Sequence, residues 1–236
     1  MNKFLKRLAV GVLSLAMVAG LTAYVPATTV KAAEDLSGKL VVIHTNDMHG
    51  RYAADSKEGS LGMSTVTALK GYYQKQGANV LLLDAGDFSQ GTNLVNYYKG
   101  LDAIYFMNAA GYDAASLGNH EFDFGLENMA ELFRMADFPV VCSNYDVTGT
   151  VLEGLVKPYI TLVREGVKIG IFGLAPKMEG LVQADKCVGI VYNDPIKVAQ
   201  EMTDLLREKE NCEVVICMSH LGCLLYTSDA ADDSLR

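Results

Sequence analysis

Short apolar runs alternate along the chain with longer segments in which apolar residues recur at helical spacing. Continuous apolar runs at residues 40–43 and 80–83 are typical of strands buried on both faces. Further strands are predicted at 114–116, 138–142 and 214–217, with a hairpin formed by 159–163 and 168–174. Helices are predicted at 61–76, 94–110, 126–135 and 195–208. This alternation predicts an α/β domain built in layers.

Polar side chains follow the ends of four predicted strands. In chain order they are Asp47, His49, Asp87, Asn119, His120 and His220. In open α/β sheets, ligands bind in the crevice beyond the carboxyl ends of the strands. The sequence therefore predicts one site at which these side chains meet.

Asp47 and His49 offer one carboxylate and one imidazole, two positions apart. In an extended chain both side chains lie on the same face, which suits a shared metal ion. His44 has the opposite parity, so we interpret it as a structural histidine.

Three later residues extend this ligand set. Asp87 follows a buried strand, Asn119 offers a neutral oxygen, and His220 offers a second imidazole. Taken singly, Asp87 could equally cap a turn or helix, and His220 could be an ordinary surface or core histidine. Together the five residues form a nitrogen and oxygen set without thiolates, which suits Zn, Mn, Co or Fe better than Ca or Mg.

His120 and Asp123 are three positions apart in the segment that follows the third strand. A carboxylate that accepts a hydrogen bond from an imidazole fixes its tautomer and stabilises its protonated form. His120 is therefore predicted to act as a general acid towards a leaving oxygen, with Asp123 orienting it. The alternative is that His120 serves the metal and Asp123 caps the next helix.

The first 32 residues are predicted to be a signal peptide. Lys3, Lys6 and Arg7 precede an apolar segment at 8–21, and a small-residue cleavage motif ends at Ala32. A membrane anchor is the alternative, but this apolar segment is shorter than the ~20 residues that span a bilayer. We expect an exported protein, secreted, periplasmic or in the cell envelope, without a transmembrane segment after cleavage.

The net charge and the cysteine spacing limit which partners and sites the chain can have. The net charge of −8 has no basic cluster after residue 32, which argues against nucleic-acid binding. The five cysteines lack metal-ligand spacing. Cys142 and Cys217 lie in apolar runs and are predicted to be buried thiols, while a disulfide between Cys187 and Cys212 stays open.

Four motifs in this order resemble those of the calcineurin-like metallophosphoesterases. They are Asp47-x-His49, Gly86-Asp87, Gly118-Asn119-His120-Glu121 and Ser219-His220-Leu221-Gly222. More narrowly, residues 43–50 and 118–123 are similar to those of exported 5′-nucleotidases and UDP-sugar hydrolases. The resemblance implies an αββα sandwich, in which two β-sheets are flanked by helices, and a hydrolase of nucleotide phosphate esters.

The resemblance also implies a centre of two divalent metal ions. Asp47 and His49 would bind the first ion, Asp87 would bridge both, and Asn119 and His220 would bind the second. His120 and Asp123 would form the catalytic dyad. The substrate would be a nucleotide or a nucleotide sugar.

The sequence departs from the family's pattern towards its C-terminal end. The family's next motif, Gly-His followed by His or Gln, and its separate nucleotide-binding domain are not found. Residues 223–236 instead resemble a translated sequencing adapter. We therefore expect a partial catalytic domain at 40–222, a non-native tail at 223–236, and little or no activity from residues 33–236 alone.

Several alternatives use the same residues. A 2′,3′-cyclic-nucleotide phosphodiesterase with 3′-nucleotidase activity, or a UDP-sugar pyrophosphatase, would share this centre. A thiosulfohydrolase of the same superfamily has no specific support in the sequence. From another class, a secreted binding protein could keep the fold without catalysis, although it would have no need for both His120 and Asp123.

Overall fold

The structure is a computed structural model, and it describes residues 35–57 and 59–222. The predicted signal peptide at 1–32 and the predicted tail at 223–236 lie outside the described residues. Among the described residues, no helix is long and apolar enough to span a membrane.

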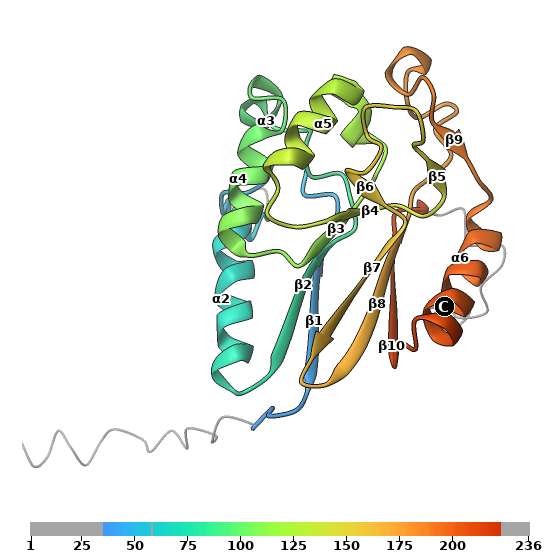
Figure 1. The fold of residues 1–236 in the computed structure, drawn as a ribbon. Helices are drawn as coiled ribbons and strands as arrows, with labels where there is room; N and C mark the ends of the chain where they lie inside the picture. Colours follow the sequence, from blue (N-terminus) through green and yellow to red (C-terminus); the bar gives the residue numbers. More distant parts are fainter. Residues whose placement is uncertain (1–34, 58, 223–236) are drawn as a thin grey trace, which may run out of the picture. The chain divides into compact units, whose positions relative to one another are not determined.

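The largest sheet has five parallel strands in the order β1-β2-β3-β4-β6 (Figure 1). These strands are β1 (Leu40–Thr45), β2 (Asn79–Asp84), β3 (Ala114–Ser116), β4 (Val140–Val141) and β6 (Val156–Lys157). In the register of the first pair, Val42 lies beside Leu81 and Thr45 beside Asp84. All five carboxyl ends therefore lie at one edge of the sheet, where the polar segments follow.

A second sheet has the order β10-β8-β7. Strand β10 (Val214–Ser219) is parallel to β8 (Val167–Leu174), and β8 is antiparallel to β7 (Tyr159–Arg164). The predicted hairpin is confirmed, and it turns at Glu165 and Gly166, both with positive φ. The short strands β5 (Tyr145–Asp146) and β9 (Val191–Tyr192) form a separate antiparallel pair that the apolar pattern did not predict.

The helices cover the outer faces of the two large sheets (Figure 1). The main helices are α2 (Gly62–Lys75), α3 (Asn93–Tyr97), α4 (Leu101–Ala110), α5 (Leu126–Met135) and α6 (Pro195–Asp204). Helix α6 begins as predicted, because the Asp194 side chain accepts a hydrogen bond from the Lys197 N–H. It runs on into a π-helical turn (Leu205–Lys209), and two short 3₁₀ segments lie at His120–Phe124 and Ala184–Lys186.

Three apolar clusters define the layers. One lies between the five-stranded sheet and α2, α4 and α5, where Leu82 and Ala115 belong to the same cluster as Met107 and Met129. A second lies between the two sheets and includes Leu81, Leu83, Ile169 and Ile171. The third joins the other face of β8 to α6. The order helix, sheet, sheet, helix confirms the predicted αββα sandwich.

The strand β1 differs from its prediction. It lies at the edge of its sheet, and Val42 is 43% exposed rather than buried on both sides. Val42 and His44 instead line a groove of about 350 Å³ together with Ile216 and Met218 of β10. The prediction that β1 is buried on both faces was wrong, because β10 forms the edge of the facing sheet and leaves this part of β1 uncovered.

Two further predictions are corrected. The helix predicted at 94–110 is split into α3 and α4, because Lys99 and Gly100 both adopt positive φ between them. Cys142 is buried as predicted, but Cys217 is exposed at the edge strand β10. The disulfide between Cys187 and Cys212, which the sequence left undecided, is not formed, because both residues are free thiols.

Candidate metal centre

The segments after β1 and β2 have an unusual backbone. Asp47, His49 and Asp87 have φ of 51°, 45° and 61°, in the left-handed region that residues other than glycine rarely adopt. Such strain persists only where surrounding contacts hold it, and it concentrates at functional sites. Here the Asp47 N–H donates to the Gly86 carbonyl and the His49 N–H donates to the Asp87 carbonyl, each at 3.0 Å. The two segments therefore fix one another.

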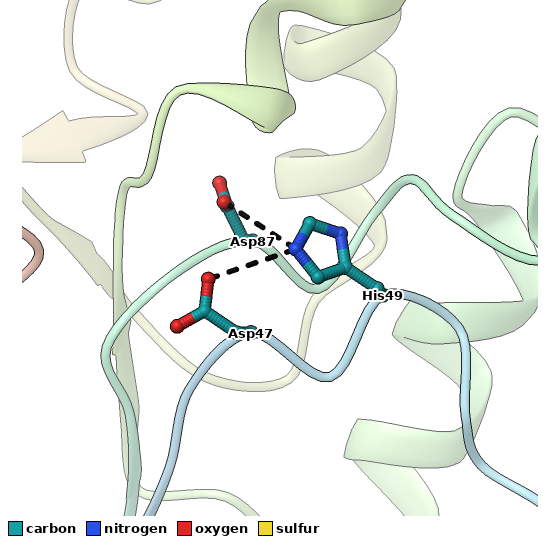
Figure 2. Close-up of side chains that lie close together, drawn as sticks. All are labelled: Asp47, His49 and Asp87. Carbon is teal, nitrogen blue, oxygen red and sulfur yellow. Dashed lines mark ion pairs between the residues drawn. The ribbon is translucent and has the colours of Figure 1, made fainter. Parts of the chain in front are cut away.

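Asp47, His49 and Asp87 come together at the carboxyl ends of β1 and β2 (Figure 2). The His49 Nε2 lies 3.6 Å from Asp47 Oδ1 and 3.7 Å from Asp87 Oδ2. Its Nδ1 lies 3.2 Å from the Gln90 carbonyl oxygen, which can only accept, so Nδ1 carries the proton. Nε2 is therefore the ring nitrogen that faces the two carboxylates.

His220 reaches the same carboxylates from the second sheet, just after β10. Its Nδ1 donates to the Ala85 carbonyl at 2.8 Å, and its Nε2 lies 3.2 Å from Asp87 Oδ2 and 3.8 Å from Asp47 Oδ1. Burial opposes a charge on this ring, but the Asp87 carboxylate raises the pKa of His220 to about 9. Burial likewise opposes the charge of Asp87, yet the bonds from His220 and from the His120 N–H lower the pKa of Asp87.

Asp47, His49 and Asp87 can hold a divalent metal ion, and His220 contacts the same two carboxylates. Two ligand atoms that each lie about 2.1 Å from an ion are roughly 3.0–3.4 Å apart at ordinary coordination angles. The nitrogen-to-oxygen distances in the group, from 3.2 to 3.8 Å, are close to that spacing. Backbone carbonyl oxygens bind Nδ1 of both imidazoles and leave Nε2 facing the carboxylates, which is the arrangement that metal-binding histidines adopt.

His120 and Asp123 form a hydrogen-bonded pair beside this group. The His120 Nδ1 lies 2.9 Å from Asp123 Oδ2, and the His120 ring packs edge-on against His49 with centroids 5.2 Å apart. Burial works against a charge on His120, but the hydrogen bond to Asp123 and the nearby carboxylates raise its pKa. A protonated imidazole with a free Nε2 is a suitable proton donor.

A hollow lies next to this pair, on the side of Asp123. The hollow, of about 370 Å³, is lined by Asp123 and Phe124, and by Gln90, Gln183 and Lys186. Asp123 belongs to the 3₁₀ segment that begins at His120, and helix α5 is preceded by Gly125 instead. The alternative role of Asp123 as the cap of that helix is therefore wrong.

Asn119 is the least constrained of the predicted residues. It is half-buried between Gly118 and His120, and its side chain forms no hydrogen bond with any described residue. His44 lies outside the group, exposed in the groove beside β10.

Two buried carboxylates at the site were not predicted from the sequence. Glu121 is 1% exposed and accepts hydrogen bonds from the backbone of both ligand segments. Asp84, at the end of β2, accepts from the Thr45 hydroxyl at 2.5 Å and from the Gly86 N–H at 2.8 Å. The signal for Glu121 was its place next to Asn119 and His120, because a glutamate in such company is rarely a packing residue.

The model of the calcineurin-like phosphoesterase family matches residues 40–235. The chain belongs to this family. The match includes all seven predicted site residues. Members of the family use divalent metal ions, in agreement with the group of Asp47, His49 and Asp87.

Relatives of this phosphoesterase chain include 5′-nucleotidases of animals and bacteria. It is 35% identical over 199 residues to 5′-nucleotidase of Rattus norvegicus, covering 79% of the chain and 34% of the relative. It is 33% identical over 218 residues to 5′-nucleotidase of Vibrio cholerae, covering 89% of the chain and 39% of the relative. The chain thus spans between a third and two fifths of the length of these relatives.

Two solved structures are also similar to this chain in fold and sequence. A 5′-nucleotidase precursor from Thermus thermophilus has a TM-score of 0.67 and 33% identity, covering 77% of this chain and 37% of that one. An NAD nucleotidase from Haemophilus influenzae has a TM-score of 0.68 and 29% identity, covering 78% and 34%.

Proposed function

We propose that the protein is an exported, metal-dependent phosphoesterase that hydrolyses nucleotide phosphate esters, as 5′-nucleotidases do. The observation that carries this proposal is the convergence of Asp47, His49, Asp87 and His220 beside the His120–Asp123 pair. The nucleotide substrate is supported by the 5′-nucleotidases among the relatives. Export is supported by the predicted signal peptide at 1–32.

We assign the metal ligands as the family resemblance implies. Asp47 and His49 would hold a first divalent ion, Asp87 would serve both ions, and Asn119 and His220 would hold a second, with Zn, Mn, Co or Fe as candidates. Bound there, the ions would activate a water and neutralise charge on the phosphoryl oxygens. Asp87 suits the bridging role, because His49 and His220 approach its Oδ2 at 3.7 and 3.2 Å.

The chain's own acid is His120. The His120 Nδ1 lies 2.9 Å from Asp123 Oδ2 and donates its proton there, so Nε2 carries the proton that can be given away. That proton would pass to the ester oxygen as the nucleoside leaves, and the hollow beside Asp123 offers room for part of the leaving group. Asp123 orients the ring and stabilises its charged form.

A UDP-sugar pyrophosphatase or a 2′,3′-cyclic-nucleotide phosphodiesterase would use the same residues, so the preferred substrate stays a proposal. A binding protein without catalysis is the alternative from another class. The proton donor His120 distinguishes an enzyme from such a binding protein, because binding alone does not need a proton donor aimed at a leaving oxygen.

The test is the variant His120→Ala in a chain extended to the length of the 5′-nucleotidase relatives, of which this chain spans about a third. We expect hydrolysis of a 5′-nucleotide to fall by about 10²–10⁴-fold, because the leaving oxygen loses its acid. The metal content should stay at the wild-type level. The matched control is His44→Ala, which removes an exposed histidine outside the group. A fully metallated His120→Ala variant with wild-type turnover would contradict the assignment.

A further inference from the structure

Glu121 places a buried carboxylate between the two segments that carry the proposed ligands. Its side chain is 1% exposed, and it lies in the 3₁₀ segment after β3. Its Oε2 accepts from the Asp87 N–H at 2.9 Å and from the Gly118 N–H at 2.7 Å. Its Oε1 accepts from the N–H groups of Phe88 and Ser89, at 2.9 and 3.3 Å, and from the Ser89 hydroxyl at 3.2 Å. Every partner is a donor.

The three donors at 87, 88 and 89 are consecutive backbone N–H groups that point at one anion. Successive N–H groups in such a turn form a concave anion-binding site. The turn begins with Asp87 at φ 61°, a conformation that costs free energy unless its surroundings hold it. The Glu121 carboxylate fills the concavity and stabilises this backbone. The direction of the Asp87 side chain follows from that backbone.

The same carboxylate fixes the second segment against the first. Gly118, whose N–H it binds, leads to His120, whose own N–H donates to Asp87 Oδ1 at 2.8 Å. Gly86 and Gly118 touch, since a Cβ on Gly86 would lie 2.3 Å from the Gly118 nitrogen. Because the Asp87 carbonyl accepts from the His49 N–H, the segment after β1 is aligned through the same turn.

We propose that Glu121 is a positioning residue of the metal centre, a built-in anion that sets Asp87 and His120 relative to each other. This inference rests on the proposed function, because it concerns the site where the metal ions would bind. Glu121 itself faces backbone donors, so its effect passes through Asp87. A buried carboxylate that served stability alone would have no reason to change the metal affinity of a folded chain.

The experiment measures Mn²⁺ affinity by isothermal titration calorimetry on the 236-residue chain, at a temperature where circular dichroism shows each variant folded. Glu121→Gln keeps the side-chain shape but turns an NH₂ group towards donors. We expect about 10–100-fold weaker Mn²⁺ binding, as for other residues that orient metal ligands. In Glu121→Ala, added acetate can occupy the vacated space and should restore part of the affinity.

The control is Asn144→Ala. Asn144 is a buried amide that accepts from the Ala175 N–H and donates to the Ala175 carbonyl, both at 2.8 Å, and none of its side-chain hydrogen bonds within residues 35–57 and 59–222 involves a proposed ligand. We expect it to lower stability and leave Mn²⁺ affinity unchanged. A folded Glu121→Gln variant with wild-type affinity would overturn the positioning role alone. A wild-type chain that binds no Mn²⁺ would overturn the metal centre and, with it, this role.

Discussion

Single residues at this site are held by backbone geometry that the sequence did not reveal. Asp47 and His49 were predicted to share a face because they are two positions apart in an extended strand. The structure brings them together differently, since both have positive φ after β1 has ended at Thr45. The residue types were predictable from their chemistry. Their geometry depends on the hydrogen bonds that their N–H groups donate to the carbonyls of Gly86 and Asp87, which lie about forty positions away.

Asp84 gives a prediction of pH-dependent stability. Complete burial raises the pKa of this carboxyl to about 7, against the bonds from Thr45 and Gly86 that favour its charge. The unfolded chain loses this proton near pH 4, whereas the folded chain keeps it up to about pH 7. Between those values the folded state binds more protons, so the free energy of unfolding falls as pH rises.

We therefore expect the free energy of unfolding of the Asp84→Asn variant to depend less on pH than that of the wild type. The amide can accept from the Gly86 N–H and donate to the Thr45 hydroxyl, which can in turn donate to Tyr112. Above pH 7 the variant should be more stable than the wild type by on the order of 1–4 kcal/mol, with the difference shrinking towards pH 4. Chemical denaturation of the metal-free chain from pH 4.5 to 8 measures it. Parallel stability curves for the two proteins would contradict the prediction.

At the scale of elements, the site depends on how closely the segment after β2 packs on the segment after β3. A Cβ on Gly118 would lie 2.1 Å from Asp87 Oδ1, although the φ of Gly118 is unexceptional. Gly118→Ala should therefore displace the Asp87 carboxylate and weaken Mn²⁺ binding at least about tenfold.

The matched control is Gly71→Ala within α2, where a Cβ would meet nothing within 4 Å. This change should stabilise the helix by about 0.5–1 kcal/mol and leave Mn²⁺ binding intact. Calorimetric titration of both variants measures the contrast. Equal Mn²⁺ affinities for Gly118→Ala and the wild type would show that the close contact does not matter.

Long helices and strands were predictable where their apolar residues recur at regular spacing, and the shortest strands were not. The predicted bounds of α2, α5 and β2 agree with the structure within one or two residues. The two-residue strands β5, β6 and β9 have no period to detect. The break between α3 and α4 depends on the left-handed backbone at Lys99 and Gly100, inside a segment whose apolar spacing continues through it.

The whole molecule was predictable as layers, because alternating buried strands and amphipathic helices have few other ways to bury their apolar faces. The pairing of β10 with β8, rather than with the first sheet, was not visible in the pattern. It depends on contacts between β8 and β10, whose residues are more than forty positions apart. That pairing brings His220 to Asp87.

The share of its relatives' length that the chain spans gives another prediction. We propose that residues 33–236 alone hydrolyse nucleotides little or not at all, because they span only 34–39% of the length of the 5′-nucleotidase relatives. A 5′-nucleotide incubated with this chain and Mn²⁺ or Zn²⁺ should release no phosphate above the buffer rate. Phosphate release that disappears in His120→Ala would contradict the proposal.

The central claim is that the strand ends of two sheets build a metal centre. Anomalous X-ray diffraction from crystals of the protein grown with Mn²⁺ tests it most directly. We predict an anomalous peak within coordination distance, about 2.0–2.3 Å, of Asp47, His49 and Asp87. Saturating Mn²⁺ that leaves these three side chains without a peak, or that gives a peak only elsewhere, would contradict the account.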